Sequence, residues 1–106
     1  MAWLMLIVAG LFEVGWAFSL KQSEGFTRFW PSAITVVLMA VSIVLLAAAM
    51  RSLPLGTAYT VWTGIGAIGA FVVGIVVLSE PATALRMLAA VLIVSGIILM
   101  KVSSTS

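Results

Sequence analysis

Hydrophobic residues fill four long stretches of the chain, and short polar segments separate them. The apolar stretches cover about residues 2–20, 31–50, 58–78 and 84–101. A bilayer core about 30 Å thick is crossed by about 20 helical residues, each rising 1.5 Å. Because every stretch has about this length, the pattern predicts an all-α integral membrane protein, a bundle of four transmembrane helices.

The polar segments contain the charges and turn residues that end each helix. They cover residues 21–25, 51–56, 79–81 and 101–106. Pro31 and Pro81 stand where a helix can begin without an amide proton, and Ser79 can cap the fourth helix. We interpret Glu80 as a solvated residue of this cap. Since little chain remains outside the four stretches, we expect residues 1–106 to form a single transmembrane domain.

The composition is typical of a chain that is surrounded by lipid. Hydrophobic residues occupy 64% of the 106 positions and charged residues 8%, and the mean hydropathy is +1.35. Soluble domains have about 25% charged residues. No cysteine is present for a disulfide scaffold, and five scattered basic residues form no patch for nucleic acid. Histidine is absent too, so we expect no metal site and no cofactor.

The basic residues hardly indicate which way the chain faces in the membrane. Four helices place Arg51 and Lys101 on the side of the chain ends, and Lys21, Arg28 and Arg86 on the other. Lys and Arg in short loops set orientation, and here they are almost evenly divided. Either one small difference decides a single orientation, or copies insert both ways. We favour the second interpretation, which permits an antiparallel, dual-topology homodimer related to the inverted repeats of transporters.

Glu13 is the one charged residue that falls inside a transmembrane stretch. It lies about 16 Å along the helix from Ala2. A carboxylate at that depth costs several kcal/mol unless it is protonated, hydrated or paired, and such residues usually have a function. A protonated carboxyl that only links two helices is the alternative. We expect Glu13 to bind both protons and a substrate.

Small and polar residues can surround Glu13. Gly10 and Trp16 lie three residues away on the same helix face, where Gly10 leaves space and Trp16 offers an indole N–H. Ser42 lies at matching depth in the second helix, although a serine there can also bond a carbonyl of its own helix. We expect these three residues to support the site.

The third helix combines two aromatic residues with several glycines. Tyr59 and Trp62 share a face, with Trp62 one turn deeper, and we expect both to line the site. Glycine is about 1 kcal/mol less favourable than alanine inside a helix. The glycines therefore indicate a hinge or a close helix crossing, and we place the hinge at Gly64 and Gly66.

The fourth helix has no ionisable residue between Arg86 and Lys101. Its small residues Ala89 and Gly96 are seven positions apart, which is typical of a packing seam between transmembrane helices. We interpret this seam as the contact between the two copies of a dimer.

A carboxylate in the membrane interior can hold a proton or an organic cation, but not both. If each occupied form can face either side of the membrane and the empty form cannot, the cation is exchanged for protons. In a dimer the titrations of two Glu13 residues would be coupled. The pattern therefore predicts a proton-coupled antiporter, with a pore-forming or accessory subunit as the alternative. An enzyme is not expected, because no second catalytic group lies at membrane depth.

Three segments closely resemble the small multidrug resistance family. They are the region around Glu13, the loop at residues 21–32 (KQSEGFTRFWPS) and residues 56–66 (GTAYTVWTGIG), and the likeness extends from residue 1 to about residue 101. The resemblance implies a four-helix exporter of the bacterial inner membrane that works as an antiparallel dimer with proton antiport. It implies Glu13 as the shared site of proton and substrate, and Tyr59 and Trp62 as lining or gating residues. It also implies the third-helix glycines as the bending point and the fourth helix as the dimer contact.

Within this family, the residues around Glu13 look like the guanidinium-exporting branch. Gly10, Trp16 and Ser42 carry this likeness, because the drug-exporting branch typically has a small residue at the position of Trp16 and often alanine at that of Gly10. A planar guanidinium ion donates two parallel N–H bonds to a carboxylate, and Trp16 and Ser42 can hold Glu13 in place for it. We expect export of small guanidinium-type cations; export of quaternary ammonium drugs or antiseptics is the alternative.

Overall fold

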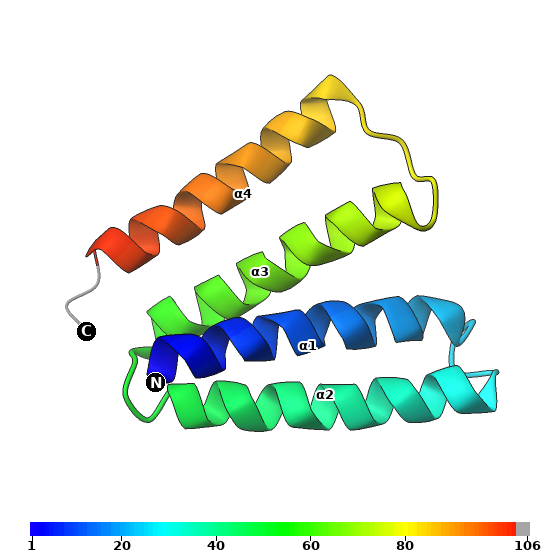
Figure 1. Ribbon diagram of the computed structural model, residues 1–106, viewed down its shortest axis with the longest axis horizontal. Helices are drawn as coiled ribbons and strands as arrows, with labels where there is room; N and C mark the ends of the chain where they lie inside the picture. Colours follow the sequence, from blue (N-terminus) through cyan, green and yellow to red (C-terminus); the bar gives the residue numbers. More distant parts are fainter. Residues whose placement is uncertain (104–106) are drawn as a thin grey trace.

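Four helices follow one another along the computed structural model, which describes residues 1–103 (Figure 1). They are α1 (Ala2–Gln22), α2 (Phe29–Ala49), α3 (Leu55–Val76) and α4 (Ala84–Ser103). All four are long and apolar enough to cross a membrane. The predicted all-α architecture with four transmembrane helices is therefore confirmed for the described part of the chain.

The helix boundaries differ from the predicted ones by a few residues. Arg28 is the N-cap of α2, so Pro31 lies within the first turn, where an amide proton has no partner inside the helix. Pro54 precedes α3, which therefore begins at Leu55.

The predicted cap of the fourth helix at Ser79 is wrong. The backbone N–H of Arg86 donates to Thr83 Oγ1 over 3.2 Å, which places the cap immediately before Ala84. Ser79 instead lies in the connecting loop with φ +56°. The reason is a backbone bond from the N–H of Glu80 to the carbonyl of Gly74 (2.9 Å), which folds the chain back onto α3 before a new helix can begin.

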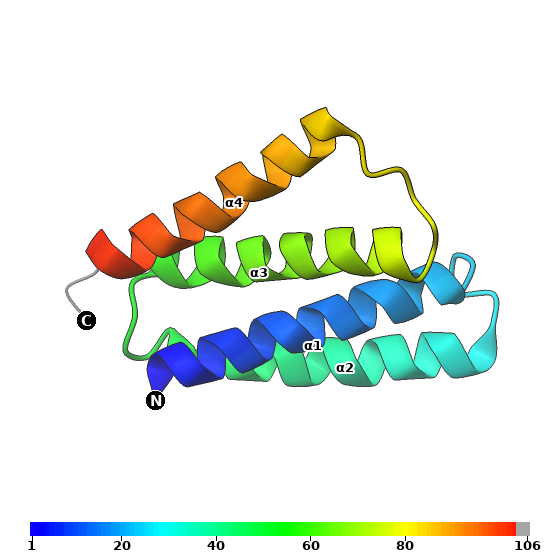
Figure 2. The same ribbon diagram turned by 45° about the horizontal axis from the view of Figure 1, so that its top comes forward.

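The helices are arranged with α1 between α2 and α3 (Figure 1). Figure 2 shows α4 close to the beginning of α3 and further from it toward the α3–α4 loop. Within residues 1–103, α3 is the only helix whose backbone runs near that of α4. A side-chain contact adds to this at one end, where the Lys101 ammonium lies 4.8 Å from the centre of the Trp3 ring.

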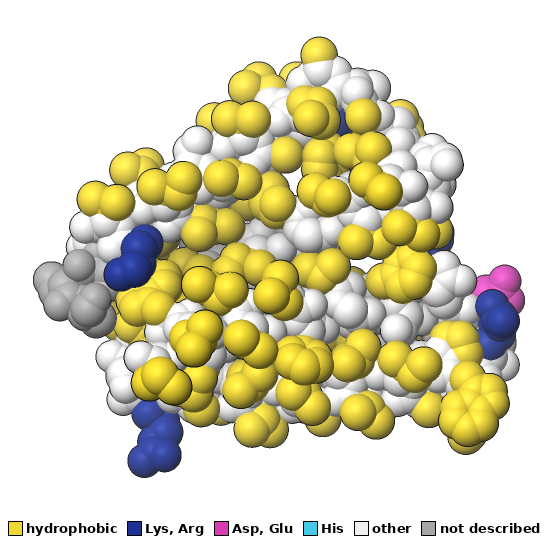
Figure 3. Space-filling model, viewed as in Figure 1, with side chains coloured by type: hydrophobic (Ala, Val, Ile, Leu, Met, Phe, Trp, Pro, Cys, Tyr) yellow, Lys and Arg dark blue, Asp and Glu magenta, His cyan; other side chains and the backbone are white. Residues whose placement is uncertain are grey.

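The buried core lies among α1, α2 and α3. Its members are mostly aliphatic residues near the end of the bundle where α1 begins: Leu6, Ala9, Leu46, Ala49, Leu53, Ala58, Val61 and Trp62. α4 contributes no buried residue. Hydrophobic side chains cover most of the face seen in Figure 3, with charges toward the ends. Such a large apolar surface is stable next to lipid and not next to water.

Candidate functional site

Glu13 lies where α1 crosses α3, and its side chain packs against Gly66. A Cβ atom on Gly66 would come within 2.8 Å of Glu13 Cγ and would overlap the carboxylate. Gly66 is itself buried, so only a residue without a side chain leaves space for the acid. Gly66, which we expected to act as a hinge, therefore forms the wall against which the carboxylate rests.

Two polar atoms on this part of α1 are buried without a hydrogen-bond partner in residues 1–103. They are Glu13 Oε1 and the indole Nε1 of Trp16, one helical turn further. A buried polar atom that makes no hydrogen bond costs about 1–3 kcal/mol. The carboxylate oxygen can accept a bond and the indole can donate one, so this pair can take up a ligand or a proton.

Ser42 is buried and makes two hydrogen bonds, neither of them to Glu13. Its hydroxyl donates to the Ala9 carbonyl of α1 over 2.7 Å, and Trp62 Nε1 donates to Ser42 Oγ over 3.0 Å. In the described chain Ser42 therefore does not donate to the Glu13 carboxylate that we expected it to hold, because a hydroxyl has one proton and Ala9 receives it. Ser42 does not bond its own helix either. The three residues instead join α1, α2 and α3 one turn from Glu13.

Tyr59 lies at the edge of this hydrogen-bonded group. Its ring centre is 5.6 Å from that of Trp62 with the planes tilted by 47°, and about half of its surface is exposed. Tyr59 also lines a groove of about 550 Å³ between α3 and α4, together with Gly64 and Gly96. The structure thus brings Tyr59 and Trp62 together, with Trp62 in the core and Tyr59 at a surface that α4 only partly covers.

The other predicted site glycines pack against isoleucines. A Cβ on Gly10 would lie within 2.6 Å of the Ile65 side chain, so Ile65 occupies the space that we expected beside Glu13. A Cβ on Gly64 would lie within 2.8 Å of Ile97 on α4. α3 is one continuous helix through Gly64 and Gly66. Bending at these two residues stays a prediction.

The seam on α4 is open in the described part of the chain. Ala89 is exposed, and a Cβ on Gly96 would meet no atom within 4 Å. The dimer contact at these residues stays a prediction. Among residues 1–103, no group of three or more His, Cys, Asp or Glu side chains comes together that could hold a metal ion.

Reasoning from the sequence missed three contacts around the site. They are the hydrogen bond from Ser42 to the Ala9 carbonyl, the packing of Val14 against Gly69, and the packing of Glu80 against Gly74. A main-chain acceptor leaves no signal in a sequence. The glycines of α3 did give a signal, because Gly66 and Gly69 are three residues apart and share the face that meets α1.

Comparison with known proteins gives consistent matches along nearly the whole chain. Residues 1–94 match the model of the family described as Small Multidrug Resistance protein. A protein of Yersinia pseudotuberculosis named guanidinium exporter is 58% identical over 104 residues, covering 98% of this chain and all of that protein. Proteins of the same name from Escherichia coli K12 and Salmonella typhimurium are 57% and 56% identical, each over 98% of this chain and 99% of theirs.

Proposed function

The chain belongs to the small multidrug resistance family, and on this premise we propose that it is a proton-coupled antiporter that exports small guanidinium-type cations across the bacterial inner membrane. The observation that carries the proposal is the buried, unpartnered Oε1 of Glu13, held against Gly66 in the interior of a membrane helix. Relatives named guanidinium exporter, at 56–58% identity over nearly the full chain, support the choice of cation.

The chemistry of Glu13 suits a planar cation with N–H donors. A guanidinium ion can donate two parallel bonds to a carboxylate, whereas a quaternary ammonium ion has no N–H to donate. The Trp16 indole, also buried without a partner, can donate to the same carboxylate and fix its orientation. The hydrogen bonds of Ser42 with Ala9 and Trp62 hold α1, α2 and α3 together close to the Glu13 carboxylate.

Transport follows from competition at this carboxylate. A protonated Glu13 carries no charge to attract the cation, and a bound cation excludes the proton. In the proposed antiparallel homodimer two Glu13 residues form one site, with α4 as the dimer contact and α3 bending at Gly64 and Gly66. If two protons enter for each cation that leaves, the membrane potential contributes about 2.3 kcal/mol per 100 mV to export.

The test is uptake of labelled guanidinium into proteoliposomes driven by an imposed pH gradient. We expect saturable uptake with the wild type, which a pore would not give, and none with Glu13→Gln. Glu24→Gln is the matched control, because Glu24 is an exposed carboxylate in the α1–α2 loop. Undiminished exchange by Glu13→Gln would refute the proposal.

A further inference from the structure

A second glutamate also rests on a glycine of α3. The Glu80 side chain folds over Gly74, where an added Cβ would lie 2.9 Å from Glu80 Cδ and would overlap Oε1. Gly74 is buried and follows Gly66 by eight residues, about 12 Å along the helix. Two carboxylates, Glu13 and Glu80, are therefore placed along α3, one at mid-membrane depth and one near the helix end.

The loop after α3 holds Glu80 in this inward position. The backbone N–H of Glu80 donates to the Gly74 carbonyl over 2.9 Å. Ser79, just before it, has φ +56°, a left-handed conformation that residues other than glycine rarely adopt. The chain thus takes an unfavourable backbone conformation that turns the carboxylate toward the helices. We expected Glu80 to be solvated, and it is instead half-buried.

Glu80 lines a cavity of about 210 Å³ between α1 and α3, which we call the Glu80 cavity; its other lining residues include Val14, Ala17 and Lys21. Val14 follows Glu13 directly in the sequence and packs against Gly69 of α3, so the inner end of the cavity adjoins the proposed substrate site. A water molecule occupies about 30 Å³ in the liquid, so the volume suffices for a guanidinium ion with some of its hydration.

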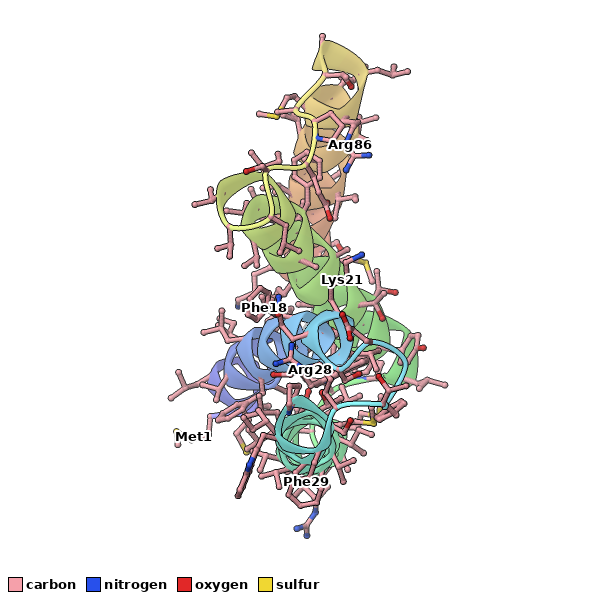
Figure 4. All side chains as sticks on the ribbon, turned by 90° about the vertical axis from the view of Figure 1, so that its right-hand side faces the viewer. Met1, Phe18, Lys21, Arg28, Phe29 and Arg86 are labelled. Atoms are coloured by element: carbon pink, nitrogen blue, oxygen red, sulfur yellow. The ribbon has the colours of Figure 1, made fainter. Side chains whose placement is uncertain are left out.

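Lys21 and Glu80 are the two charged residues that line this cavity. Viewed from this end of the bundle, Lys21 extends from α1 toward α3 (Figure 4). No ion pair within 4.0 Å joins Lys21 to Glu80 in the described residues. A planar guanidinium ion binds a carboxylate through two bonds in a fixed geometry, which a flexible ammonium group does not match.

The two other basic residues at this end are directed elsewhere. The Arg86 guanidinium lies 5.4 Å from the centre of the Phe71 ring, and Arg28 Nη1 donates to the Gln22 carbonyl over 3.4 Å. Neither residue lines the Glu80 cavity. Among residues 1–103, Lys21 is therefore the one basic side chain of the cavity that can compete with an incoming cation for Glu80.

We infer that Glu80 is a docking carboxylate at the mouth of the α1–α3 interface, which binds a guanidinium-type cation before the cation reaches Glu13. The inference rests on the proposed function and adds a second binding residue to it. Lys21 keeps the affinity of Glu80 for the cation low, so the cation is held only briefly. In the proposed antiparallel homodimer, each membrane face has one such mouth.

The test measures initial rates of guanidinium uptake into proteoliposomes over a range of concentrations. For Glu80→Gln we expect KM to rise about fivefold or more, with the maximal rate within about twofold of wild type. For Lys21→Gln we expect KM to fall, because the competing cation is removed. Glu24→Gln is the matched control, since Glu24 is an exposed carboxylate in the loop at the same end of the bundle, and we expect an unchanged KM.

A second variant tests whether the position of the Glu80 carboxylate matters, and not only its charge. Gly74→Ala keeps the Glu80 carboxylate but pushes it away from α3, and we expect the same rise in KM as for Glu80→Gln. An unchanged KM in Glu80→Gln would overturn the docking site and leave the proposed function intact. An equal rise in Glu24→Gln would also overturn it, because the effect would then come from surface potential alone. If the wild type shows no guanidinium uptake, both proposals fail.

Discussion

The Glu13 carboxylate on α1 and Gly66 on α3 are in such close contact that no side chain can replace the glycine hydrogen. This packing fixes where the acid lies relative to α3. It also means that a single methyl group can test whether the position of the carboxylate matters for binding.

Gly66→Ala is expected to weaken guanidinium binding at least tenfold and to lower stability by about 1–3 kcal/mol, the usual cost of overpacking a buried position. The added methyl group must displace the Glu13 carboxylate. Calorimetry of guanidinium binding and thermal unfolding in detergent measure the two effects. Gly56→Ala is the control, because a Cβ there meets nothing within 4 Å. Wild-type affinity in Gly66→Ala would contradict the contact.

Ser42→Ala is expected to destabilise the protein by about 1–3 kcal/mol, because Trp62 Nε1 and the Ala9 carbonyl lose their partner in the core. Trp62→Phe removes the same Trp62–Ser42 bond, so the double variant should lose less than the sum of the two single losses. Unfolding in detergent gives all three values. Ser95→Ala is the control, since Ser95 is exposed and bonds only the Val91 carbonyl of its own helix. Additive losses would show that Ser42 and Trp62 are not coupled.

Gly96→Leu is expected to leave the fold of the protomer unchanged and to break the proposed dimer. Space is open at Gly96 within the protomer, so a larger side chain meets no obstacle until a second copy packs there. Circular dichroism reports the fold, and light scattering in detergent reports the mass of the particle. A variant that remains a dimer would place the contact elsewhere.

The proposed dual topology can be measured directly because the chain has no cysteine. We expect a single cysteine introduced at Gln22, in the last turn of α1, to be labelled by a membrane-impermeant thiol reagent in about equal amounts from each side of the membrane. A cysteine at Ser52 in the α2–α3 loop should behave in the same way. Labelling from one side only would show a single orientation and exclude the antiparallel pair.

The elements that could be predicted from the sequence are those set by one-dimensional patterns. Four apolar stretches of membrane-spanning length predict four helices, and Glu13 is visible as the one charge inside such a stretch. The sequence does not indicate which residue caps α4: the cap is Thr83 and not Ser79, because a bond from Glu80 to Gly74 joins residues that only the folded loop brings together.

Which side chains meet within the site depends on how far each helix is rotated about its own axis. The sequence of an almost uniformly apolar helix gives little indication of this rotation. Gly10 and Gly66 are the same residue type within apolar helices, yet Ile65 packs against Gly10 and Glu13 packs against Gly66. Ser42 meets a carbonyl of α1, and a main-chain acceptor has no side chain that would mark it. Ser42 and Trp62 thus lie about one helical turn from Glu13, although with different hydrogen-bond partners from those expected.

We propose that a guanidinium-type cation and protons compete for Glu13. Adding guanidinium to weakly buffered, detergent-solubilised protein should therefore release protons. The affinity should fall as the pH is lowered, because a proton on the carboxylate must leave before the cation can bind. We expect proton release that saturates with guanidinium in the wild type and is absent in Glu13→Gln. Guanidinium binding without proton release, or equal release by Glu13→Gln, would contradict it.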